Sequence, residues 1–253
     1  MILVQSDNER KLPHHFDAAS AMYGAIEMGE NYRLTSFEEI QSGKLNNLLR
    51  LNAAVGSTDF MNEVFKQLGI EEVRLPRNSD RKCEFITLGQ AHARVAAGEK
   101  LFVKPVAIKL FSGLVLDGTT YTSLAGVPED TMVMAYKPFE EKLKAEWRVY
   151  IRRNQVVDAR NYSGDLFTVP DEKYIQEIIE QNKGDFPCAY TIDVGILGSP
   201  VITKVAYKTW EILTGVTNVV VEFNDMWAIG NYGMPNDTYL SMLKERYFEI
   251  IRK

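Results

Sequence analysis

The chain has 253 residues, of which 45% are hydrophobic and 25% charged, so it can bury a full core in one or two domains. Its formal net charge is −5 and its pI is near 5.4, which excludes the overall basic field typical of nucleic-acid-binding proteins. The two cysteines lie far apart and there are three histidines, so the sequence contains neither a disulfide framework nor the ligand spacing of a zinc site.

Residues 1–80 alternate between patterns typical of strands and of helices. The apolar run at the amino terminus ends before Gln5, so this run is too short for a signal peptide. Because no run approaches membrane-spanning length either, we expect a soluble, cytoplasmic protein. Predicted strands cover 2–4 and 48–55, and predicted helices cover 16–28 and 58–68, the second one with Ser57 as its N-cap. A strand, a glycine turn and a capped helix are the parts of a doubly wound α/β unit.

A lysine stands inside an otherwise apolar strand that begins at Leu101. Before it, residues 75–100 are rich in basic and turn-forming residues and predict a connector that ends in a helix at 90–97. The ammonium of Lys104 would gain a strong interaction if it reached a phosphate. Lys109 follows, and then Ser112 and Gly113, where backbone amides could approach the same phosphate. A hairpin with two surface lysines explains the pattern equally well.

An arginine occupies the next alternating segment, which we expect to be a hairpin with strands at 146–152 and 156–162. Alternation places Glu146 and Arg148 on one face of the first strand, and Arg160 on the second strand would be another basic group nearby. A guanidinium stays charged and offers two parallel donors, which suits a phosphate. Ordinary cross-strand pairing of Glu146 with an arginine is the alternative.

Acidic and amide side chains occupy two later strands, at 189–196 and 219–225. Asp193 stands in the first of them, among apolar residues. The three valines of the second predict a strand buried on both faces, with Glu222 and Asn224 on one face and Phe223 on the other. Oxygen ligands of this kind suit Mg²⁺, whereas a strand that runs out to the surface would leave them in water. Helices are predicted at 170–182 and 236–252, residues 201–213 fit a strand or a helix, and Asp225 is expected to be a turn residue.

Along the chain the basic groups come first and the oxygen ligands last, which is the division that a nucleoside triphosphate with Mg²⁺ requires. A Walker A loop and protein-kinase signatures are missing. The order of Lys104-Pro105, Glu146-Trp147-Arg148, Asp193 and Glu222-Phe223-Asn224 resembles that of the ATP-grasp superfamily. The segments EWRVYI, DVG and VEFNDMWAIGNYG, with a later arginine, look closest to the clade named for two arginines and a lysine. This resemblance covers roughly residues 100–235.

The resemblance implies a mixed α/β (α+β) ATP-grasp fold that follows an N-terminal doubly wound domain. We expect the N-terminal pre-ATP-grasp domain at 1–80 and the ATP-grasp domain at 81–253, with lobes at about 100–135 and 136–253. One feature departs from the family, because the interval between Asp193 and Glu222 is long.

The resemblance also assigns roles to individual residues. Phosphates would be held by Lys104 and Lys109 under a turn that contains Ser112 and Gly113, with residues 231–233 as a second cover. The strand of Met134, Ala135 and Tyr136 would meet the adenine through its backbone, and Glu140 or Glu141 the ribose. Glu146 and Arg148 would also lie in the cofactor site. The catalytic residues would be Arg148, Arg160 and Lys109, and the metal ligands Asp193, Glu222 and Asn224.

The activity that the resemblance implies is ATP- and Mg²⁺-dependent ligation of a carboxylate to an amine through an acyl phosphate. The expected partners are small-molecule or peptide carboxylates and amines, with no membrane or nucleic-acid partner, and a homodimer stays open. One alternative is a nucleotide-binding interaction protein without turnover. Another is a nucleic-acid ligase or nucleotidyltransferase with a lysine nucleophile, which ranks lower because neither Lys104 nor Lys109 precedes the x-Asp-Gly of such enzymes.

Overall fold

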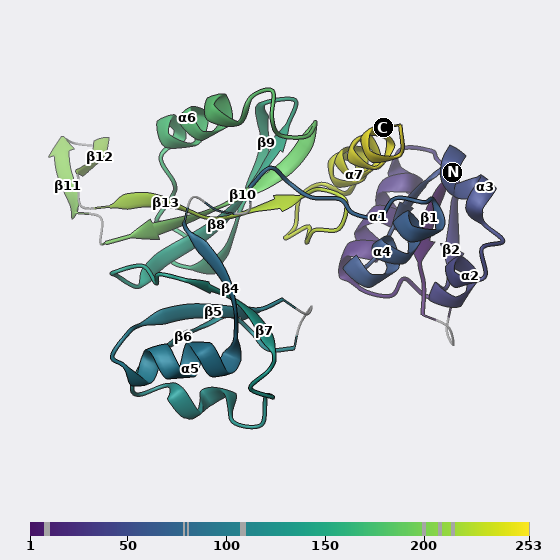
Figure 1. Cartoon of the computed structure of the whole chain (residues 1–253). Helices are drawn as coiled ribbons and strands as arrows, with labels where there is room; N and C mark the ends of the chain where they lie inside the picture. The colour runs from purple at the N-terminus through teal and green to yellow at the C-terminus, as the bar shows by residue number, and fades with distance from the viewer. Residues whose placement is uncertain are drawn as a thin grey trace. The chain divides into compact units, whose positions relative to one another are not determined.

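A computed structural model of the chain describes residues 1–7, 11–77, 79, 81–106, 110–198, 201–206, 209–213 and 216–252 (Figure 1). The chain divides into two compact units. The larger unit consists of Met1–Asn78 and Lys144–Lys253, and the smaller unit is Ser79–Leu143. In the described segments, no helix is both long and apolar enough to cross a lipid bilayer.

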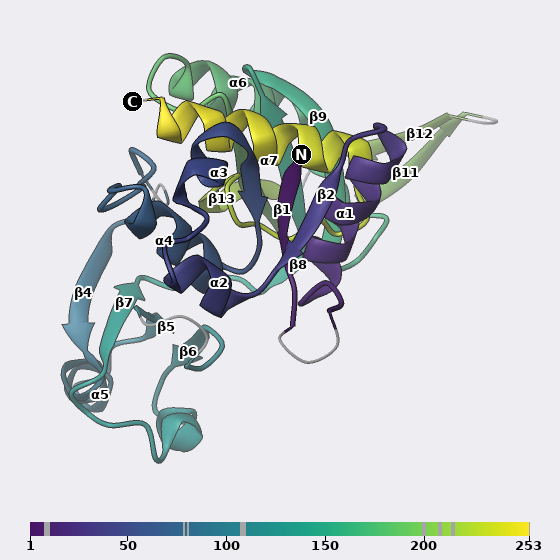
Figure 2. The ribbon, with the colours of Figure 1, turned by 90° about the vertical axis from the view of Figure 1, so that its right-hand side faces the viewer.

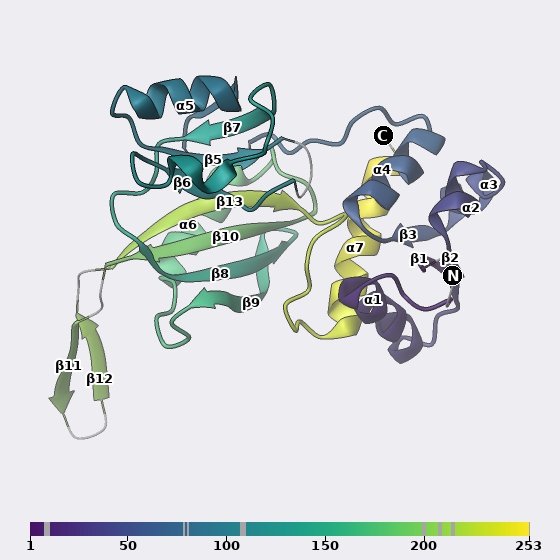
Figure 3. The same ribbon diagram turned by 90° about the horizontal axis from the view of Figure 1, so that it is seen from below.

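The larger unit contains a three-stranded parallel sheet of order β2-β1-β3, made of Tyr32–Thr35, Ile2–Gln5 and Ala53–Val55. Helix α1 (Phe16–Glu27) lies between β1 and β2 in the chain. Helices α2 (Phe37–Gln41) and α3 (Asn46–Leu51) lie between β2 and β3, and α4 (Thr58–Gln67) follows β3. All of β1 is buried, because helices cover the sheet from both sides: α1 on one side, α2 and α4 on the other (Figure 3). The expected mixture of parallel strands and helices is therefore confirmed.

Two local predictions in this region have different outcomes. The side chain of Ser57 accepts a hydrogen bond from the backbone N–H of Phe60, so the predicted N-cap of α4 is confirmed. The predicted strand at 48–55 is wrong in its first half, because the leucine-rich segment around Leu49 forms α3 and only Ala53–Val55 forms a strand. Leucine and arginine are good helix formers, and one helical turn suffices to bury Leu49.

The C-terminal helix α7 (Asn236–Ile251) returns to the N-terminal sheet and lies alongside α1 (Figure 2). Its buried residues, among them Tyr239, Leu240, Leu243 and Tyr247, join the core of the strands β1 and β3. This confirms the predicted amphipathic helix. The division into domains at residue 80 stays a prediction.

A second sheet of the larger unit has the order β13-β10-β8-β9, formed by Thr217–Asp225, Ala189–Leu197, Leu143–Arg152 and Gln155–Gly164. Helix α6 (Glu172–Asn182) covers one face of this sheet (Figure 1), and Phe223 lies in the core between them. The predicted hairpin is confirmed as β8–β9. The expectation that 219–225 is buried on both faces is wrong, because Val219 and Val221 are only half-buried. In addition, β13 is an edge strand, with β10 as its neighbour on one side only.

Residues 201–213, which the sequence left open, form the strands β11 (Val201–Ala206) and β12 (Thr209–Leu213) of a separate two-stranded sheet. This hairpin fills the interval between β10 and β13, which pair directly with each other. It therefore accounts for the long interval between Asp193 and Glu222, which lie opposite each other in the register.

The smaller unit contains an antiparallel sheet of order β4-β7-β5-β6, made of Cys83–Thr87, Met132–Tyr136, Leu101–Pro105 and Leu114–Leu116. Helix α5 (Leu88–Ala96) packs on one face, and a 3₁₀ turn, η1 (Tyr121–Leu124), follows β6. The predicted connector at 75–100 is thus wrong over 83–87, because these residues pair with β7 as a strand.

Gly24 marks a close approach of α1 to the start of α7, since a Cβ there would lie 2.3 Å from the carbonyl oxygen of Asn236. Gly24→Ala should lower the free energy of unfolding by about 1–2 kcal/mol, because backbone overlap outweighs the better helix propensity of alanine. Urea denaturation measures the change. Gly118→Ala is the matched control, as a Cβ at Gly118 meets nothing within 4 Å. Equal effects of both substitutions would contradict the close packing of the helices.

Candidate functional site

A buried ion pair lies on the face of the β13-β10-β8-β9 sheet opposite α6. Arg148 on β8 is 6% exposed and Asp193 on β10 is 2% exposed. Nε of Arg148 donates to Oδ1 of Asp193 at 2.8 Å, and Nη2 donates to Oδ2 at 2.7 Å. The inward orientation that alternation predicted for Arg148 is confirmed, and its partner is the buried aspartate instead of Glu146.

Burial and charge act in opposite directions on this pair. Burial raises the pKa of Asp193 above its usual value. The charges of Glu222 and Glu146 raise this pKa further, whereas the hydrogen bonds and charge of Arg148 lower it. Burial would lower the pKa of Arg148, but its contacts with Asp193 raise it. The guanidinium therefore stays charged beside the carboxylate.

Two tyrosines cover Arg148. The centre of the guanidinium lies 4.8 Å from the ring centroid of Tyr232 and 5.7 Å from that of Tyr162. The two rings stack on each other with centroids 5.1 Å apart and planes 14° apart. The hydroxyl of Tyr162 donates to Oε2 of Glu146 at 3.1 Å, so Glu146 also belongs to this cluster.

The expected metal ligands lie on the same face. Glu222 is opposite Asp193 in the strand register, and Nδ2 of Asn224 donates to Oδ2 of Asp193 at 3.3 Å. That hydrogen bond turns Oδ1, the metal-ligating atom of an amide, away from Asp193. Among the residues that the structure describes, no three His, Cys, Asp or Glu side chains gather as a metal site, so the candidate set is two carboxylates and one amide. Its hard oxygen donors fit Mg²⁺, and a cation would relieve the repulsion between Glu222 and Asp193.

Two neighbouring charged residues are engaged elsewhere. Arg160 lies opposite Arg148 in the β8–β9 register, but its Nε and Nη2 donate to Oδ2 of Asp158 at 3.0 and 2.7 Å. Asp225, at the end of β13, accepts two hydrogen bonds of 2.6 Å from the buried Arg246 of α7. Asp225 therefore anchors the C-terminal helix and is separate from the Arg148–Asp193 cluster.

In the smaller unit, the sheet face opposite α5 carries Phe102, Lys104, Met134 and Tyr136, since Phe102 pairs with Tyr136 and Lys104 with Met134. Nζ of Lys104 lies 6.0 Å from the ring centroid of Tyr136. The guanidinium of Arg81 lies over three rings of this unit, 5.5 Å from Phe102, 4.8 Å from Tyr136 and 4.3 Å from Phe139. This face thus combines aromatic surface with two cations.

The expected covering turn is described only in part. A Cβ at Gly113 would lie 2.7 Å from Cζ of Phe102 and 3.4 Å from Cβ of Lys104, so the backbone there lies directly against these side chains. Ser112 is exposed beside it. Lys109 lies outside the described residues.

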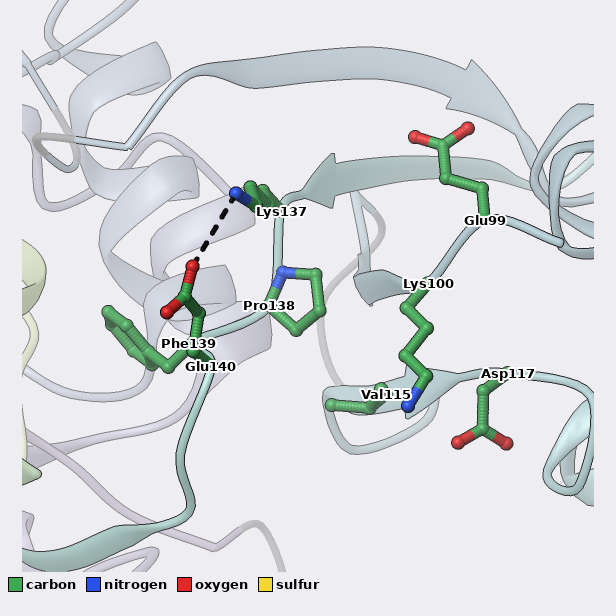
Figure 4. Close-up of a pocket in the computed structure, with 8 residues that line it drawn as sticks. All are labelled: Glu99, Lys100, Val115, Asp117, Lys137, Pro138, Phe139 and Glu140. Atoms are coloured by element: carbon green, nitrogen blue, oxygen red, sulfur yellow. Dashed lines mark ion pairs between the residues drawn. The ribbon is translucent and has the colours of Figure 1, made fainter. Parts of the chain in front are cut away.

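The end of β7 borders a pocket in the smaller unit (Figure 4). Its lining residues come from before β5, the end of β6 and the segment after β7: Glu99, Lys100, Val115, Asp117, Lys137, Pro138, Phe139 and Glu140. Figure 4 shows Lys100 and Asp117 on one side of Pro138 and the Lys137–Glu140 ion pair, at 3.9 Å, on the other. Glu140, expected at the ribose, lines this pocket, whereas Glu141 does not belong to its lining.

The backbone of Met134, Ala135 and Tyr136 pairs with β4 on one side and with β5 on the other. Backbone groups that can meet a ligand therefore begin after Tyr136, in the segment that lines the pocket. Sequence reasoning missed Tyr162 and the role of Arg81. Signals were present in both cases: Tyr162 follows Arg160 at strand spacing, and Arg81 belongs to the basic cluster before β4.

Comparisons with known proteins bear on the family and the fold of the chain. A family model for the ATP-grasp domain, the second family of the clade named for two arginines and a lysine, matches residues 79–242. The structure is similar to that of D-alanine–D-alanine ligase from Bacillus anthracis complexed with ATP, with 13% identity and a TM-score of 0.53 over 99% of this chain and 97% of that one. It is also similar to N5-carboxyaminoimidazole synthetase from Staphylococcus aureus, with 10% identity and a TM-score of 0.52 over 96% and 77%. Identities this low show a shared fold alone. A search of curated proteins found no significant match.

Asp193→Ala should lower the free energy of unfolding by about 3–5 kcal/mol, because it leaves Arg148 buried without its partner. Asp158→Ala, which breaks the half-buried pair with Arg160 in the same sheet, should cost about 1 kcal/mol or less. Chemical denaturation of both variants measures the contrast. Similar losses would mean that the Arg148–Asp193 pair is no more than a surface-type ion pair.

Proposed function

The chain belongs to the ATP-grasp superfamily, in the clade named for two arginines and a lysine, and on this basis we propose that it ligates a carboxylate to an amine through an acyl phosphate. ATP and Mg²⁺ are the cofactors of this family, whose members include ATP-dependent ligases. The observation that carries the finer proposal is the Arg148–Asp193 pair with Glu222 and Asn224 on one sheet face. One fixed cation beside oxygen donors suits the transfer of a phosphoryl group to a carboxylate.

In the proposed reaction, a carboxylate oxygen of the substrate attacks the γ-phosphorus of ATP. The bond to the bridging oxygen breaks, which gives an acyl phosphate and ADP. An amine then attacks the acyl carbon, loses a proton and displaces inorganic phosphate, so that an amide forms. None of these steps needs a covalent enzyme nucleophile, and charge and positioning supply the rate.

Arg148 would stabilise the charge on the transferring phosphoryl group and on the acyl phosphate. Its described hydrogen bonds with Asp193 use Nε and Nη2. Nη1 is therefore the nitrogen that is left to meet a substrate oxygen. Arg160 would assist if it exchanged Asp158 for an anionic ligand.

When Mg²⁺ is bound, it would screen the phosphate charges between the nucleotide and the protein. Glu222 and Oδ1 of Asn224 would hold it. Asp193 would contribute less directly than expected from the sequence, because both of its oxygens accept hydrogen bonds from Arg148. We assign Asp193 the additional task of orienting Arg148 and Asn224.

Nucleotide binding would use the open face and the pocket of the smaller unit. Lys104 would contact the phosphates, with Lys109, Ser112 and Gly113 covering them. Adenine would meet the backbone that follows Met134, Ala135 and Tyr136, and Glu140 would meet the ribose. Val115, Pro138 and Phe139 offer the apolar surface that a base requires.

The proposed substrates are small-molecule or peptide carboxylates and amines. Incubation with ATP and Mg²⁺ over a panel of amino acids and peptides tests the proposal, with ADP, AMP and phosphate followed. We expect ADP and phosphate in equal amounts, dependent on an acid and an amine together. AMP or an adenylated lysine would indicate nucleotidyl transfer instead, and nucleotide binding without turnover an interaction protein.

Glu222→Ala and Asn224→Ala should each lower this Mg²⁺-dependent turnover by about 100-fold or more, since each removes a metal ligand. Their melting temperatures should stay close to that of the unmodified chain, because both residues are only half-buried. Titration of turnover against Mg²⁺ measures the effect. Full activity in both variants would refute the metal assignment.

Lys104→Ala should weaken ATP binding by about tenfold or more, because it removes a charge-assisted contact to phosphate. Isothermal calorimetry compares it with Lys142→Ala, which removes an exposed lysine from the same unit. Unchanged affinity in the Lys104 variant would make that strand lysine purely structural.

A further inference from the structure

The loop between β13 and α7 contains a residue in a costly conformation. Tyr232 has φ of +49°, in the left-handed region that non-glycine residues seldom adopt. Aromatic side chains gain nothing there from local hydrogen bonds, unlike asparagine. Such a conformation persists only where the surroundings impose it, and it is a reason to ask what the residue does.

Hydrogen bonds hold the backbone of the loop on the N-terminal side of Tyr232. The hydroxyl of Tyr239 donates to the carbonyl oxygen of Ile229 at 2.5 Å. The hydroxyl of Tyr150 lies 2.7 Å from the carbonyl oxygens of both Gly230 and Asn231, which share its one proton. The backbone N–H of Asn231 donates to Oδ1 of Asp17 at 2.8 Å. The loop is thus held through its backbone, without any contribution from the Tyr232 ring.

A second energetically unfavourable feature, a buried amide, lies next to Tyr232. Asn231 is 1% exposed, and neither Nδ2 nor Oδ1 of its side chain has a hydrogen-bond partner in the described part of the chain. An unsatisfied buried amide is unfavourable for folding. Two adjacent unfavourable features indicate that this loop is shaped by something other than stability.

The conformation brings the Tyr232 ring onto Arg148. Its centroid lies 4.8 Å from the guanidinium centre, and its ring stacks on Tyr162. Tyr232 is nevertheless 47% exposed, so its ring adds little to the hydrophobic core. What the ring does is cover the guanidinium, whose attraction for an anion strengthens when water is excluded from it.

We propose that Tyr232 is a positioning residue, which holds Arg148 desolvated and directed at the transferring phosphoryl group. This inference rests on the proposed ligase function and adds to it. Strain in the loop would then be the cost of placing one aromatic ring over the cation.

The test uses Tyr232→Asn, because asparagine tolerates the left-handed conformation and lacks the ring. The probes are Mg·ADP, and Mg·ADP with aluminium fluoride as a mimic of the transferring phosphoryl group, each bound to the full chain and measured by calorimetry. We expect the variant to bind Mg·ADP within about twofold of the original affinity and the fluoride complex about tenfold more weakly. Its melting temperature should rise by about 2–4 °C as strain is relieved. Tyr232→Phe, which keeps the ring, should restore the affinity for the fluoride complex.

Arg153→Asn is the matched control. Arg153 also has a left-handed φ, +51°, and lies in the β8–β9 turn with an exposed side chain. Because this variant also loses the ion pair of Arg153 with Glu245, it should gain less stability than Tyr232→Asn, with no change in either affinity. An unchanged preference for the fluoride complex in Tyr232→Asn would overturn the inference, as would a lower melting temperature, which would make the ring a structural anchor. If the unmodified chain bound neither complex, the proposed function itself would fail, and the inference with it.

Discussion

The ion pair between Arg148 and Asp193 is the constraint on which the candidate site depends. Two charges taken out of water are stable only when geometry and additional hydrogen bonds compensate for the lost hydration. Here the pair is bidentate, and Asn224 adds a third hydrogen bond to Asp193. The three residues stand on β8, β10 and β13, so the ion pair links β8 to β10 and the hydrogen bond of Asn224 links β13 to β10. Helix α6 makes this possible, because it supplies the apolar burial on the opposite face.

The charges around the pair explain why a cation fits beside it. Arg148 neutralises Asp193, but Glu222 and Glu146 add negative charge next to that carboxylate, and Arg160 is engaged by Asp158. The charges of Glu222 and Glu146 add to the burial that raises the pKa of Asp193, and a bound cation would offset this repulsion. Arg148, in turn, is well placed for an anionic group. One sheet face can thus hold both the metal and the phosphoryl group.

The sequence predicts the faces of strands well and their partners poorly. Alternation placed Glu222 and Asn224 on one face and Phe223 in the core, and the structure confirms the core position of Phe223. It also predicted that Arg148 points inward. It could not reveal that Asp193, 45 residues later, is its partner, because pairing between distant strands depends on register. Nor could it predict the irregular register beside Trp147, or the left-handed backbone of Tyr232 before Gly233.

The interval between Asp193 and Glu222 shows why spacing along the chain is a weaker guide than register. From the sequence, its length is a departure from the family, so the support for Asp193 is weaker than that for Glu222 and Asn224. In the structure, β11 and β12 absorb the extra residues as a separate hairpin, and β10 pairs with β13 as if the hairpin were absent. The entropy of closing a loop grows only slowly with its length, so such an insertion costs little. The proposed metal site needs Asp193 and Glu222 side by side, and the antiparallel register places them opposite each other independently of the number of residues between them.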